Sequence, residues 1–327
     1  MYAPDVVMYH DPCVDGVTSA AIIYRYYKQE NPDHTIEFLP SRHDTKKKLS
    51  NFIDKVRGKH VMMVDFSFPR ALLIKFSQAA ESILIIDHHI TAKEDLDDFI
   101  IYDEIKPKDF EQITKENKIS AYFDMEECAS SMCYKAFPIS NEPGESDFVD
   151  YVRDNDIGKF ELSGHENFRA WARAQDYDVK KFALDIGASH FDHHMVSIME
   201  EGSHILKMMQ KLVKQLADEE TRFGKLEDIH DNIPYCITDY FLSSDYAHYQ
   251  IKQGFNLAIG FYFTKHGIGA SVRSDETIRS DLIAKAFGGG GHKQAAGFNI
   301  PWADLPSFVN SLYRNEFYLF GGQDGTE

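Results

Sequence analysis

The consecutive residues Asp87, His88 and His89 combine three side chains that could bind a metal ion, and they follow a short apolar run at residues 83–86. A carboxylate oxygen and two imidazole nitrogens suit a borderline divalent ion such as manganese better than magnesium, which prefers oxygen ligands alone. A solvated loop with two incidental histidines would have the same sequence, because a single short motif is weakly specific. The metal-site interpretation therefore depends on which other ligand residues accompany the triplet.

Other potential ligands also follow predicted strands. Apolar runs at residues 6–9, 36–39, 60–64 and 83–86 are typical of buried strands, and they alternate with helix-like segments at residues 16–28, 44–56 and 69–80. This alternation predicts an α/β domain with a mostly parallel sheet covered by helices on both faces. His10, Cys13 and Asp15 follow the first strand, Asp65 follows the third and the triplet follows the fourth. Because ligand sites form beyond the carboxyl ends of such strands, we expect these side chains to share one site.

Two further carboxylates, Asp154 and Asp156, follow a segment at residues 147–153 that we predict to be helical. The dipole of a helix opposes negative charge at its C-terminus, so a positive group should compensate these two side chains. A metal ion would do so, although an acidic surface loop also explains this segment when it is taken alone. The sequence does not separate the two aspartates.

A glycine run at residues 288–291, followed by His292 and Lys293, predicts a phosphate-binding segment. Glycines let a backbone approach a ligand and expose its N–H groups, and the next two side chains add donors and charge. Residues 270–298 hold four Lys or Arg and three Asp or Glu, a balance of +1 within a chain of net charge −17. Arg273, in a predicted strand at residues 269–273, can pair with a phosphate through two N–H groups. A flexible linker is the alternative, but a predicted helix at residues 283–287 and an Ala-Ala pair flank the run.

The composition is that of a folded chain whose few cysteines suit a reducing compartment. It has 43% hydrophobic and 27% charged residues, four cysteines without zinc-type spacing, and no apolar run near the ~18 residues of a membrane span. No secretory signal is apparent, so we expect a cytoplasmic protein without membrane association. The net charge of −17 argues against a long nucleic-acid track, because such binding depends on Lys and Arg. Short anionic substrates remain compatible, since bound metal ions can supply positive charge.

The length of 327 residues is enough for two domains. Apolar residues recur at helical spacing over residues 196–221, which predicts one long amphipathic helix. We therefore expect a metal-binding domain at residues 1–190, a linker helix at residues 191–225 and a smaller α+β substrate-binding domain at residues 226–320. The active site is expected in the cleft between the two domains, and the sequence leaves a homodimer open.

Taken together, these motifs resemble the DHH phosphoesterases, in the subgroup with the DHH-associated C-terminal domain. The triplet is similar to the name-giving motif, residues 10–19 look like the first motif, and Asp65 in Met-Val-Asp-Phe-Ser looks like the second. Asp154 and Asp156 are both candidates for the single aspartate of the fourth motif. Residues 288–298 and 271–274 are similar to the signature of the C-terminal domain and to the motif before it. The resemblance covers nearly the whole chain.

The resemblance implies a two-metal centre and assigns roles to individual residues. Two Mn²⁺ ions are expected, with Mg²⁺ or Co²⁺ as alternatives, and Asp65 is expected to bridge them. The implied catalytic residues are Asp65, His88 and His89, and His89 contacts substrate or supports the ligands. The implied metal ligands are His10, Cys13, Asp15, Asp65, Asp87, His88 and Asp154 or Asp156. The implied substrate contacts are His89, Arg273, Ser274, Gly289, Gly290, Gly291, His292 and Lys293.

Cys13 is a departure from the family pattern, which usually has two aspartates one residue apart in the first motif. Here the first of the pair aligns with Cys13, Asp15 is the second, and the spacing from His10 differs slightly. A thiolate binds soft or borderline ions but suits manganese poorly. Cys13 therefore either weakens one metal position, shifts its metal preference, or is merely tolerated beside the site.

By resemblance, the activity is a metal-dependent phosphodiesterase or exonuclease that releases terminal nucleotides. The expected substrates are short single-stranded RNA or DNA, such as oligoribonucleotides of a few residues, or linear dinucleotides such as pApA, because no accessory nucleic-acid-binding domain is apparent. One alternative is a polyphosphate or pyrophosphate hydrolase, which would need more Lys and Arg near the site. The other is a nucleotide-binding protein that has lost catalysis through Cys13.

Overall fold

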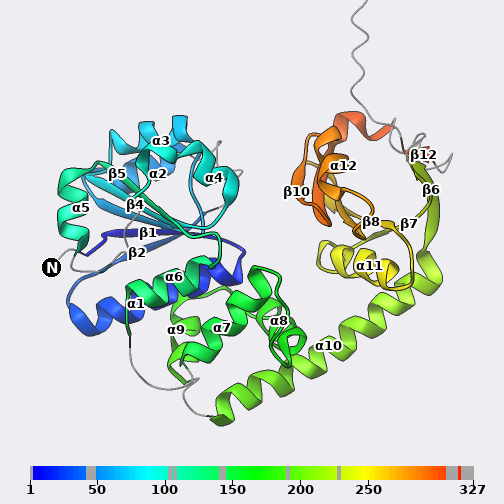
Figure 1. Cartoon of the computed structure of the whole chain (residues 1–327), viewed down its shortest axis with the longest axis horizontal. Coiled ribbons are helices and arrows are strands. Elements are labelled where there is room, and N and C mark those ends of the chain that lie inside the picture. Colours follow the sequence, from blue (N-terminus) through cyan, green and yellow to red (C-terminus); the bar gives the residue numbers. More distant parts are fainter. Residues whose placement is uncertain are drawn as a thin grey trace, which may run out of the picture. The chain divides into compact units, whose positions relative to one another are not determined.

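The computed structural model describes residues 3–41, 49–101, 106, 109–139, 145–188, 192–226, 230–306 and 316–317 (Figure 1). The chain divides into two compact units, Met1–Leu206 and Lys207–Glu327. Helix α10 (Asp192–Glu220) contributes residues to both units, and it lies within the segment predicted as a linker helix.

The N-terminal unit is built on a five-stranded, fully parallel sheet of strand order β2-β1-β3-β4-β5. The strands are β1 (Val6–His10), β2 (Glu37–Ser41), β3 (His60–Val64), β4 (Ser82–Asp87) and β5 (Ile119–Phe123). The parallel α/β architecture predicted from the sequence is therefore confirmed. Strand β5 is not among the predicted strands, because its Ser120 interrupts the continuous apolar run that identifies the other buried strands.

Helices cover both faces of this sheet. Alternate residues of the central strands enter two separate cores, as when Val7 and Met62 face one core while Val6 and Val61 face the other. The first core is completed by α1 (Val14–Glu30), α6 (Ala129–Ala136), α7 (Glu145–Asp156), α8 (His165–Arg173) and α9 (Val179–Ala188). Residues of α2 (Leu49–Val56) and α3 (Arg70–Ser77) belong to the second core. The shorter helices of this unit are α4 (Ile90–Asp95), α5 (Phe110–Glu116) and the 3₁₀ turn Asp97–Phe99.

The predicted helices differ from the observed ones at their ends, and the helices predicted at residues 44–56 and 147–153 are two examples. The helix predicted at residues 44–56 is described from Leu49, since residues 42–48 lie outside the described part of the chain. The helix predicted at residues 147–153 runs instead from Glu145 to Asp156, so Asp154 and Asp156 occupy its last turn. This extension matters for the site, because it fixes the two carboxylates in helical geometry.

The C-terminal unit contains a mixed seven-stranded sheet of order β10-β11-β9-β8-β7-β6-β12. Its strands are β6 (Arg222–Leu226), β7 (His230–Thr238), β8 (Leu257–Thr264), β9 (Gly267–Ser274), β10 (Gly290–His292), β11 (Ala295–Pro301) and β12 (Glu316–Phe317). Its helices are α11 (Tyr240–Lys252), α12 (Ser280–Ala286) and the 3₁₀ turn Trp302–Asp304. The predicted α+β composition of this part is confirmed. The glycine run forms part of the β10–β11 hairpin, in which Gly291 pairs with Ala296.

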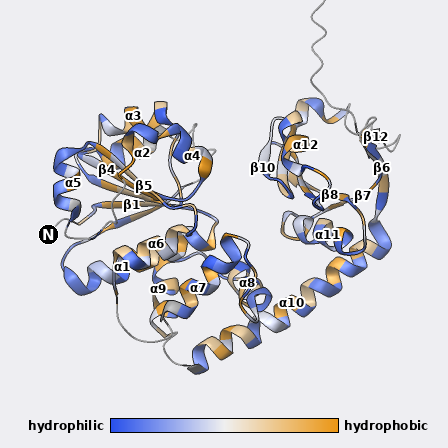
Figure 2. Ribbon diagram, viewed as in Figure 1, coloured by the Kyte–Doolittle hydropathy of each residue, from blue (hydrophilic) through white to orange (hydrophobic). Residues whose placement is uncertain are grey.

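Figure 2 shows polar and apolar residues interspersed along α10, which accords with the predicted amphipathic pattern. Among the described residues, no helix is both long enough and apolar enough to cross a membrane.

Candidate metal centre

Three adjacent strands of the N-terminal sheet bring most of the predicted ligands to one edge. His10 is the last residue of β1, Asp65 directly follows β3, and Asp87 is the last residue of β4. Because β1, β3 and β4 are neighbours and run parallel, their carboxyl ends meet at the same edge of the sheet. The structure therefore assembles the residues that the strand pattern suggested would share a site.

Asp65 is the centre of this cluster. Its Oδ2 lies 3.3 Å from Nδ1 of His10, and its Oδ1 lies 3.3 Å from Nε2 of His88. The residue is only 1% exposed, and its φ angle of 55° is in the left-handed region, where a residue other than glycine is strained by about 1–3 kcal/mol. The backbone N–H of Asp65 donates to the carbonyl of Ile86 at 3.0 Å, which holds this conformation against β4. The strained backbone thus turns one carboxylate oxygen toward each of two imidazoles.

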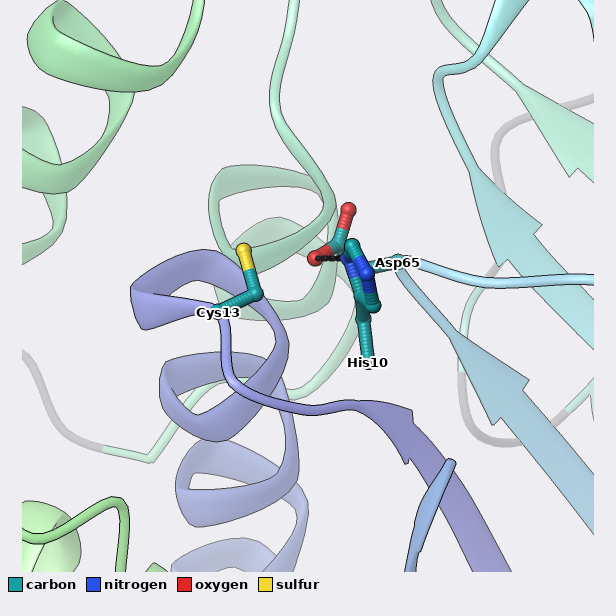
Figure 3. Close-up of side chains that lie close together, drawn as sticks. All are labelled: His10, Cys13 and Asp65. Atoms are coloured by element: carbon teal, nitrogen blue, oxygen red, sulfur yellow. Dashed lines mark ion pairs between the residues drawn. The ribbon is translucent and has the colours of Figure 1, made fainter. Parts of the chain in front are cut away.

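The first ligand group consists of His10, Cys13 and Asp65, whose ligand atoms all lie within 4.8 Å of one another (Figure 3). Cys13 is the N-cap residue of α1, so the group joins the end of β1, the start of α1 and the end of β3. Gly16 makes this approach possible, because a Cβ there would lie 2.3 Å from the carbonyl oxygen of His10. A nitrogen, a sulfur and an oxygen therefore converge at one position.

The second ligand group consists of Asp15, His88 and Asp156. His88 Nε2 lies 3.3 Å from Asp156 Oδ2 and 3.8 Å from Asp15 Oδ2. Asp65, His88 and His89 form a third overlapping group. Asp65 and His88 thus belong to more than one group, which is the arrangement expected where two cations share ligands.

Backbone N–H groups at the start of α6 orient Asp15. Ala129 and Ser130 donate to its two carboxylate oxygens, each at 2.8 Å. A helix N-terminus favours negative charge, so α6 stabilises the ionised form of a carboxylate that is almost completely buried. These two residues were not predicted from the sequence, although Cys128 and Ser131 form a capping box that marks the start of this helix.

The structure places Asp87 beside the ligand groups and not within them, as far as the described residues show. Its Oδ1 accepts hydrogen bonds from the backbone N–H of His88 at 2.8 Å and from Nδ1 of His89 at 2.7 Å. These bonds fix the direction of the turn after β4 and the orientation of the His89 ring. In this geometry Asp87 acts as a positioning residue for the two histidines that follow it.

Asp154 and Asp156 have different environments. Asp154 accepts hydrogen bonds from the backbone N–H groups of Glu161 at 2.8 Å and Leu162 at 3.3 Å, which close the loop after α7. Asp156 faces His88 and belongs to the second ligand group. The structure therefore brings Asp156, and not Asp154, to the metal cluster.

Replacing Asp156 by asparagine should weaken divalent-ion binding, whereas Asp154→Asn should leave it unchanged. Loss of groups that only support a metal ligand costs 10- to 100-fold in affinity, so loss of a ligand should cost at least about tenfold. Asp154→Asn keeps an acceptor oxygen for Glu161 and should cost only about 1 kcal/mol of stability. Isothermal titration with Mn²⁺ measures both affinities, and an equal loss in the two variants would contradict this assignment.

Burial and mutual repulsion strongly affect the acids of the cluster. Burial and the Asp65 carboxylate raise the pKa of Asp15, and burial with the neighbouring aspartates raises the pKa of Asp156 well above its ordinary value. Burial also acts to raise the pKa of Asp65, but contacts with His10 and His88 outweigh it and hold that pKa below its usual range. Burial lowers the pKa of His88, yet the surrounding carboxylates outweigh this effect and raise it to about 9.

The residues present fit a divalent cation. Asp65 Oδ2, which belongs to the first ligand group, is a buried oxygen that accepts no hydrogen bond of normal geometry from the described residues. Buried carboxylate oxygens are costly unless a donor or a cation satisfies them. The raised pKa values of His88 and Asp156 point the same way, because closely packed acids hold protons where no cation balances their charge. The cluster therefore suits a positive ion.

His89 lies at the rim of the cluster. Its side chain is 37% exposed, and its Nδ1 contacts Asp87 Oδ1. Burial lowers the pKa of His89, but the hydrogen bond with Asp87 and the charge of nearby carboxylates outweigh burial and raise it. A partly exposed imidazole with a raised pKa, next to the ligand groups, is suited to contact an anionic substrate.

The C-terminal residues predicted to bind phosphate lie on one face of the second sheet. His292 pairs with Ala295 across the β10–β11 ladder, and Ala295 pairs with Arg273 across the β11–β9 ladder, so these three side chains share a face. With strands 4.7–4.9 Å apart, the Cα atoms of Arg273 and His292 are roughly 10 Å apart. The next row on the same face is formed by Gly290, Gly297 and Ser271. The side chains of Arg273 and His292 therefore lie beside a row of small residues, Gly290, Gly297 and Ser271, which we call the glycine floor.

Helix α11 holds Arg273 in place. Nη2 of Arg273 donates to Oγ of Ser244 at 2.5 Å, and Nη1 donates to the carbonyl of Val272 at 2.8 Å. Ser244 was not predicted, and a lone serine in a helix carries no recognisable signal in the sequence. This contact links the guanidinium to a rigid element.

Three of the other predicted substrate residues have different surroundings. Ser274 is buried, donates to the carbonyl of Ile278 and accepts a hydrogen bond from Ser280, so its hydroxyl stabilises the turn before α12. Lys293 is exposed, and its carbonyl accepts the backbone N–H of Ser280 at 2.7 Å. A Cβ at Gly289 would lie 2.1 Å from the carbonyl of Gly297, so Gly289 is required for hairpin packing.

Comparison with known proteins identifies both units. Residues 6–152 match the DHH family, N-terminal domain, and residues 245–315 match the DHHA1 domain. An uncharacterized protein of Acanthamoeba polyphaga mimivirus is 25% identical over 323 residues, which cover 90% of this chain and 66% of that protein. The chain therefore spans just under two thirds of the length of this relative.

Solved structures share the fold at low sequence identity. The DHH domain of a member of a family of ribosomal proteins has a TM-score of 0.56 at 14% identity, covering 95% of this chain and 86% of that chain. Exonuclease RecJ bound to manganese has a TM-score of 0.51 at 12% identity, covering 95% of this chain and 90% of that chain. RecJ of Thermus thermophilus in complex with Mn²⁺ has a TM-score of 0.50 at 13% identity, covering 96% of this chain and 53% of that chain.

The two family matches fall on the two compact units, and the fold is shared with RecJ. The protein therefore belongs to the DHH phosphoesterase superfamily.

Proposed function

We propose that this protein is a metal-dependent phosphodiesterase that hydrolyses short oligonucleotides or linear dinucleotides to mononucleotides. The observation that carries the proposal is the Asp65 carboxylate, which turns one oxygen toward His10 and the other toward His88. A carboxylate in this position can bridge two divalent ions, and paired ions are used to clamp the attacking and leaving oxygens of phosphoryl transfer. The manganese-bound structures of RecJ support Mn²⁺ as the first ion to test.

When bound, the ions supply positive charge to phosphoryl oxygens and acidify a water molecule. The protein residues have separate tasks around them. Asp65 holds the centre of the site, Asp15 and Asp156 provide negative charge on one side, and α6 keeps Asp15 oriented. His89, oriented by Asp87, donates a hydrogen bond to a phosphoryl oxygen of the substrate. The metal site would thus position one phosphodiester group of the substrate, and the residues that hold the ions would keep their positions.

The glycine floor supplies a second place for negative charge. Arg273 and His292 lie on the same face as Gly290, and bare glycine backbone lets a phosphate approach closely. We assign this surface to the terminal phosphate or nucleotide of the substrate. A short substrate then suits a chain with a net charge of −17, because few cationic side chains are needed for its few phosphates.

The direct test is hydrolysis of a labelled RNA pentamer and of pApA in Mn²⁺, with pyrophosphate and polyphosphate as parallel substrates. Stepwise release of mononucleotides from the pentamer is expected, together with loss of activity after chelation. Release of phosphate from pyrophosphate alone would contradict the proposal and favour a phosphohydrolase. Nucleotide binding without any hydrolysis would contradict it in favour of a binding role.

Replacing Gly290 by valine should raise the KM for the pentamer at least about tenfold without lowering stability. A Cβ at Gly290 would meet no atom within 4 Å, and valine is favourable in a strand, so the hairpin should accept the side chain. The added methyl groups would occupy the space above the glycine floor and keep a phosphate away from the backbone. Steady-state kinetics and thermal unfolding measure the two effects.

Leu282→Val is a suitable control for the same measurement, since Leu282 is an exposed residue of α12 in the same unit. It should leave both KM and the melting temperature nearly unchanged. An unchanged KM in Gly290→Val, with the fold intact, would show that substrate does not use the glycine floor.

A further inference from the structure

We propose that the two cation positions are chemically different, so that His10, Cys13 and Asp65 hold a thiophilic divalent ion such as Zn²⁺ or Co²⁺ through the Cys13 sulfur. The second group, Asp15, His88 and Asp156, offers only oxygen and nitrogen and takes a harder ion such as Mn²⁺. This inference rests on the proposed function only in requiring that the cluster binds metal. It does not depend on the substrate.

The position of Cys13 distinguishes it from the other cysteines. Cys128, Cys133 and Cys236 are buried in the apolar cores at 0–1% exposure, whereas Cys13 is partly exposed at the rim of the cluster. Cysteines behave as small apolar side chains when they are used for packing. Cys13 instead faces a histidine nitrogen and a carboxylate, with all three ligand atoms within 4.8 Å (Figure 3). A residue that was merely tolerated beside the site would not need this convergence.

The backbone around Cys13 is fixed by the start of α1. Its φ and ψ angles of −143° and 132° are those of an N-cap residue, and its carbonyl accepts the backbone N–H of Val17 at 3.1 Å. The side chain of an N-cap often accepts a hydrogen bond from the helix, but the Cys13 sulfur accepts none of normal geometry and has only a weak contact with the backbone N–H of Gly16. The helix start therefore determines the direction of the side chain and leaves its sulfur available to bind an ion.

Asp65 gives an independent indication that a cation lies at this position. It is only 1% exposed, and its Oδ2, on the side of His10 and Cys13, is a buried oxygen without a hydrogen bond of normal geometry from the described residues. A neutral thiol adds no positive charge next to this oxygen, and His10 Nδ1 lies 3.3 Å from it without a hydrogen bond of normal geometry. A cation would bind the oxygen together with the sulfur and the imidazole.

The donor set determines the class of ion. One histidine nitrogen, one cysteine sulfur and one carboxylate oxygen, with a fourth position open to water or substrate, are typical of catalytic zinc sites. Thiolate ligands favour Zn²⁺ over Mn²⁺, because the softer donor prefers the softer ion. Since the second group lacks sulfur, the preference for a thiophilic ion is confined to the first group.

Cobalt substitution of the metal-free full-length chain tests this proposal without any substrate. Bound Co²⁺ should give a near-ultraviolet sulfur-to-cobalt charge-transfer band in the native protein. The band should be absent in Cys13→Ser and in Cys13→Asp, and it should persist in Cys236→Ser. Serine and aspartate are both favourable N-cap residues, so both Cys13 variants should retain α1 and the fold.

Metal affinity gives the second measurement. In Cys13→Ser the affinity for Zn²⁺ at the tighter-binding position should fall about 10- to 100-fold, since loss even of a supporting group has effects of this size. In Cys13→Asp the preference for Zn²⁺ over Mn²⁺ should fall at least about tenfold, because an oxygen replaces the sulfur. Titration by calorimetry with each ion measures both changes.

Absence of the charge-transfer band in the native protein, or its persistence in Cys13→Ser, would overturn the proposal. Equal Zn²⁺ affinity in the native protein and in Cys13→Ser would also overturn it. These outcomes are distinguishable from failure of the proposed function, which would appear as loss of pentamer hydrolysis while the cobalt band remained.

Discussion

Replacing Asp65 by asparagine is expected to reduce hydrolysis of the RNA pentamer on the order of 10³-fold or more and to weaken binding of both divalent ions. Each oxygen of this carboxylate faces a different imidazole of the cluster, so the substitution removes negative charge from both cation positions together. A ligand that served one position would affect one ion. Mass spectrometry under native conditions or metal analysis after dialysis measures the number of ions retained.

Asparagine is the appropriate replacement because of the backbone at this position. The φ angle of 55° lies in the left-handed region, which asparagine and aspartate tolerate better than other residues with a side chain. Asp65→Ala would add backbone strain to the loss of charge, and its effect would mix the two causes. Asp65→Asn should therefore keep the native circular dichroism spectrum.

Asp154→Asn provides the matched control, since Asp154 is also a buried aspartate near the site but bonds to backbone N–H groups. It should retain both ions and most of the activity. Retention of one tightly bound ion by Asp65→Asn, with the other lost, would contradict the bridging role of Asp65.

The metal-free protein is expected to lose stability as the pH rises from about 6.5 to about 9. The pKa of His88 is raised from 6.5 to about 9, so its stabilising contribution is complete below pH 6.5 and is lost as the pH passes through 9. A shift of this size corresponds to an effect on the order of 3 kcal/mol. Thermal unfolding in the presence of a chelator, measured across this pH range, gives the result directly.

The aspartates of the cluster change stability in the same direction as His88 or act outside this pH range. Asp15 and Asp156 have raised pKa values, so they also favour folding most at low pH and oppose it as the pH increases. Asp65 has a lowered pKa, and its contribution is present above pH 3.8 and is lost only in stronger acid. Together, these contributions should make the melting temperature of the metal-free protein fall as the pH rises through the neutral range.

Saturating Mn²⁺ should reverse this dependence. Metal binding requires deprotonated ligands, so its stabilising effect increases with pH as the cluster releases protons. The difference in melting temperature between the metal-bound and metal-free protein should therefore widen from about pH 6.5 to about 9. The Asp65→Asn variant should show a smaller difference at every pH. A constant difference would show that the cluster does not exchange protons for metal.

The sequence alone was sufficient for the parallel sheet and for the central ligands. Buried strands read as continuous apolar runs, and parallel strands place their carboxyl ends together, so His10, Asp65 and the triplet at residues 87–89 could be assigned to one edge from these patterns. The α+β composition of the C-terminal unit was also predicted, because its glycine run and its strand-like and helix-like segments are local features. Strand β5 was not predicted, because its buried but polar Ser120 interrupts the apolar run that identifies a buried strand.

Only the tertiary structure distinguished residues that are equally plausible metal ligands in the sequence. Asp154 and Asp156 are two residues apart in α7 and therefore about 200° apart around the helix axis, and the packing of Phe148 and Val152 decides which one faces His88. Asp87 likewise reads as a ligand in the sequence, but its bonds to the next two residues use one oxygen to orient them.

The surroundings of Cys13 and of Arg273 also depend on contacts between distant parts of the chain. Cys13 meets Asp65 because two neighbouring strands end side by side, and Arg273 meets Ser244 because α11 packs on β9. Local patterns determine which elements form and which side chains lie at their ends. The packing of those elements determines which of these side chains converge, because atoms far apart in the sequence are brought into contact by burial of the helix and sheet faces.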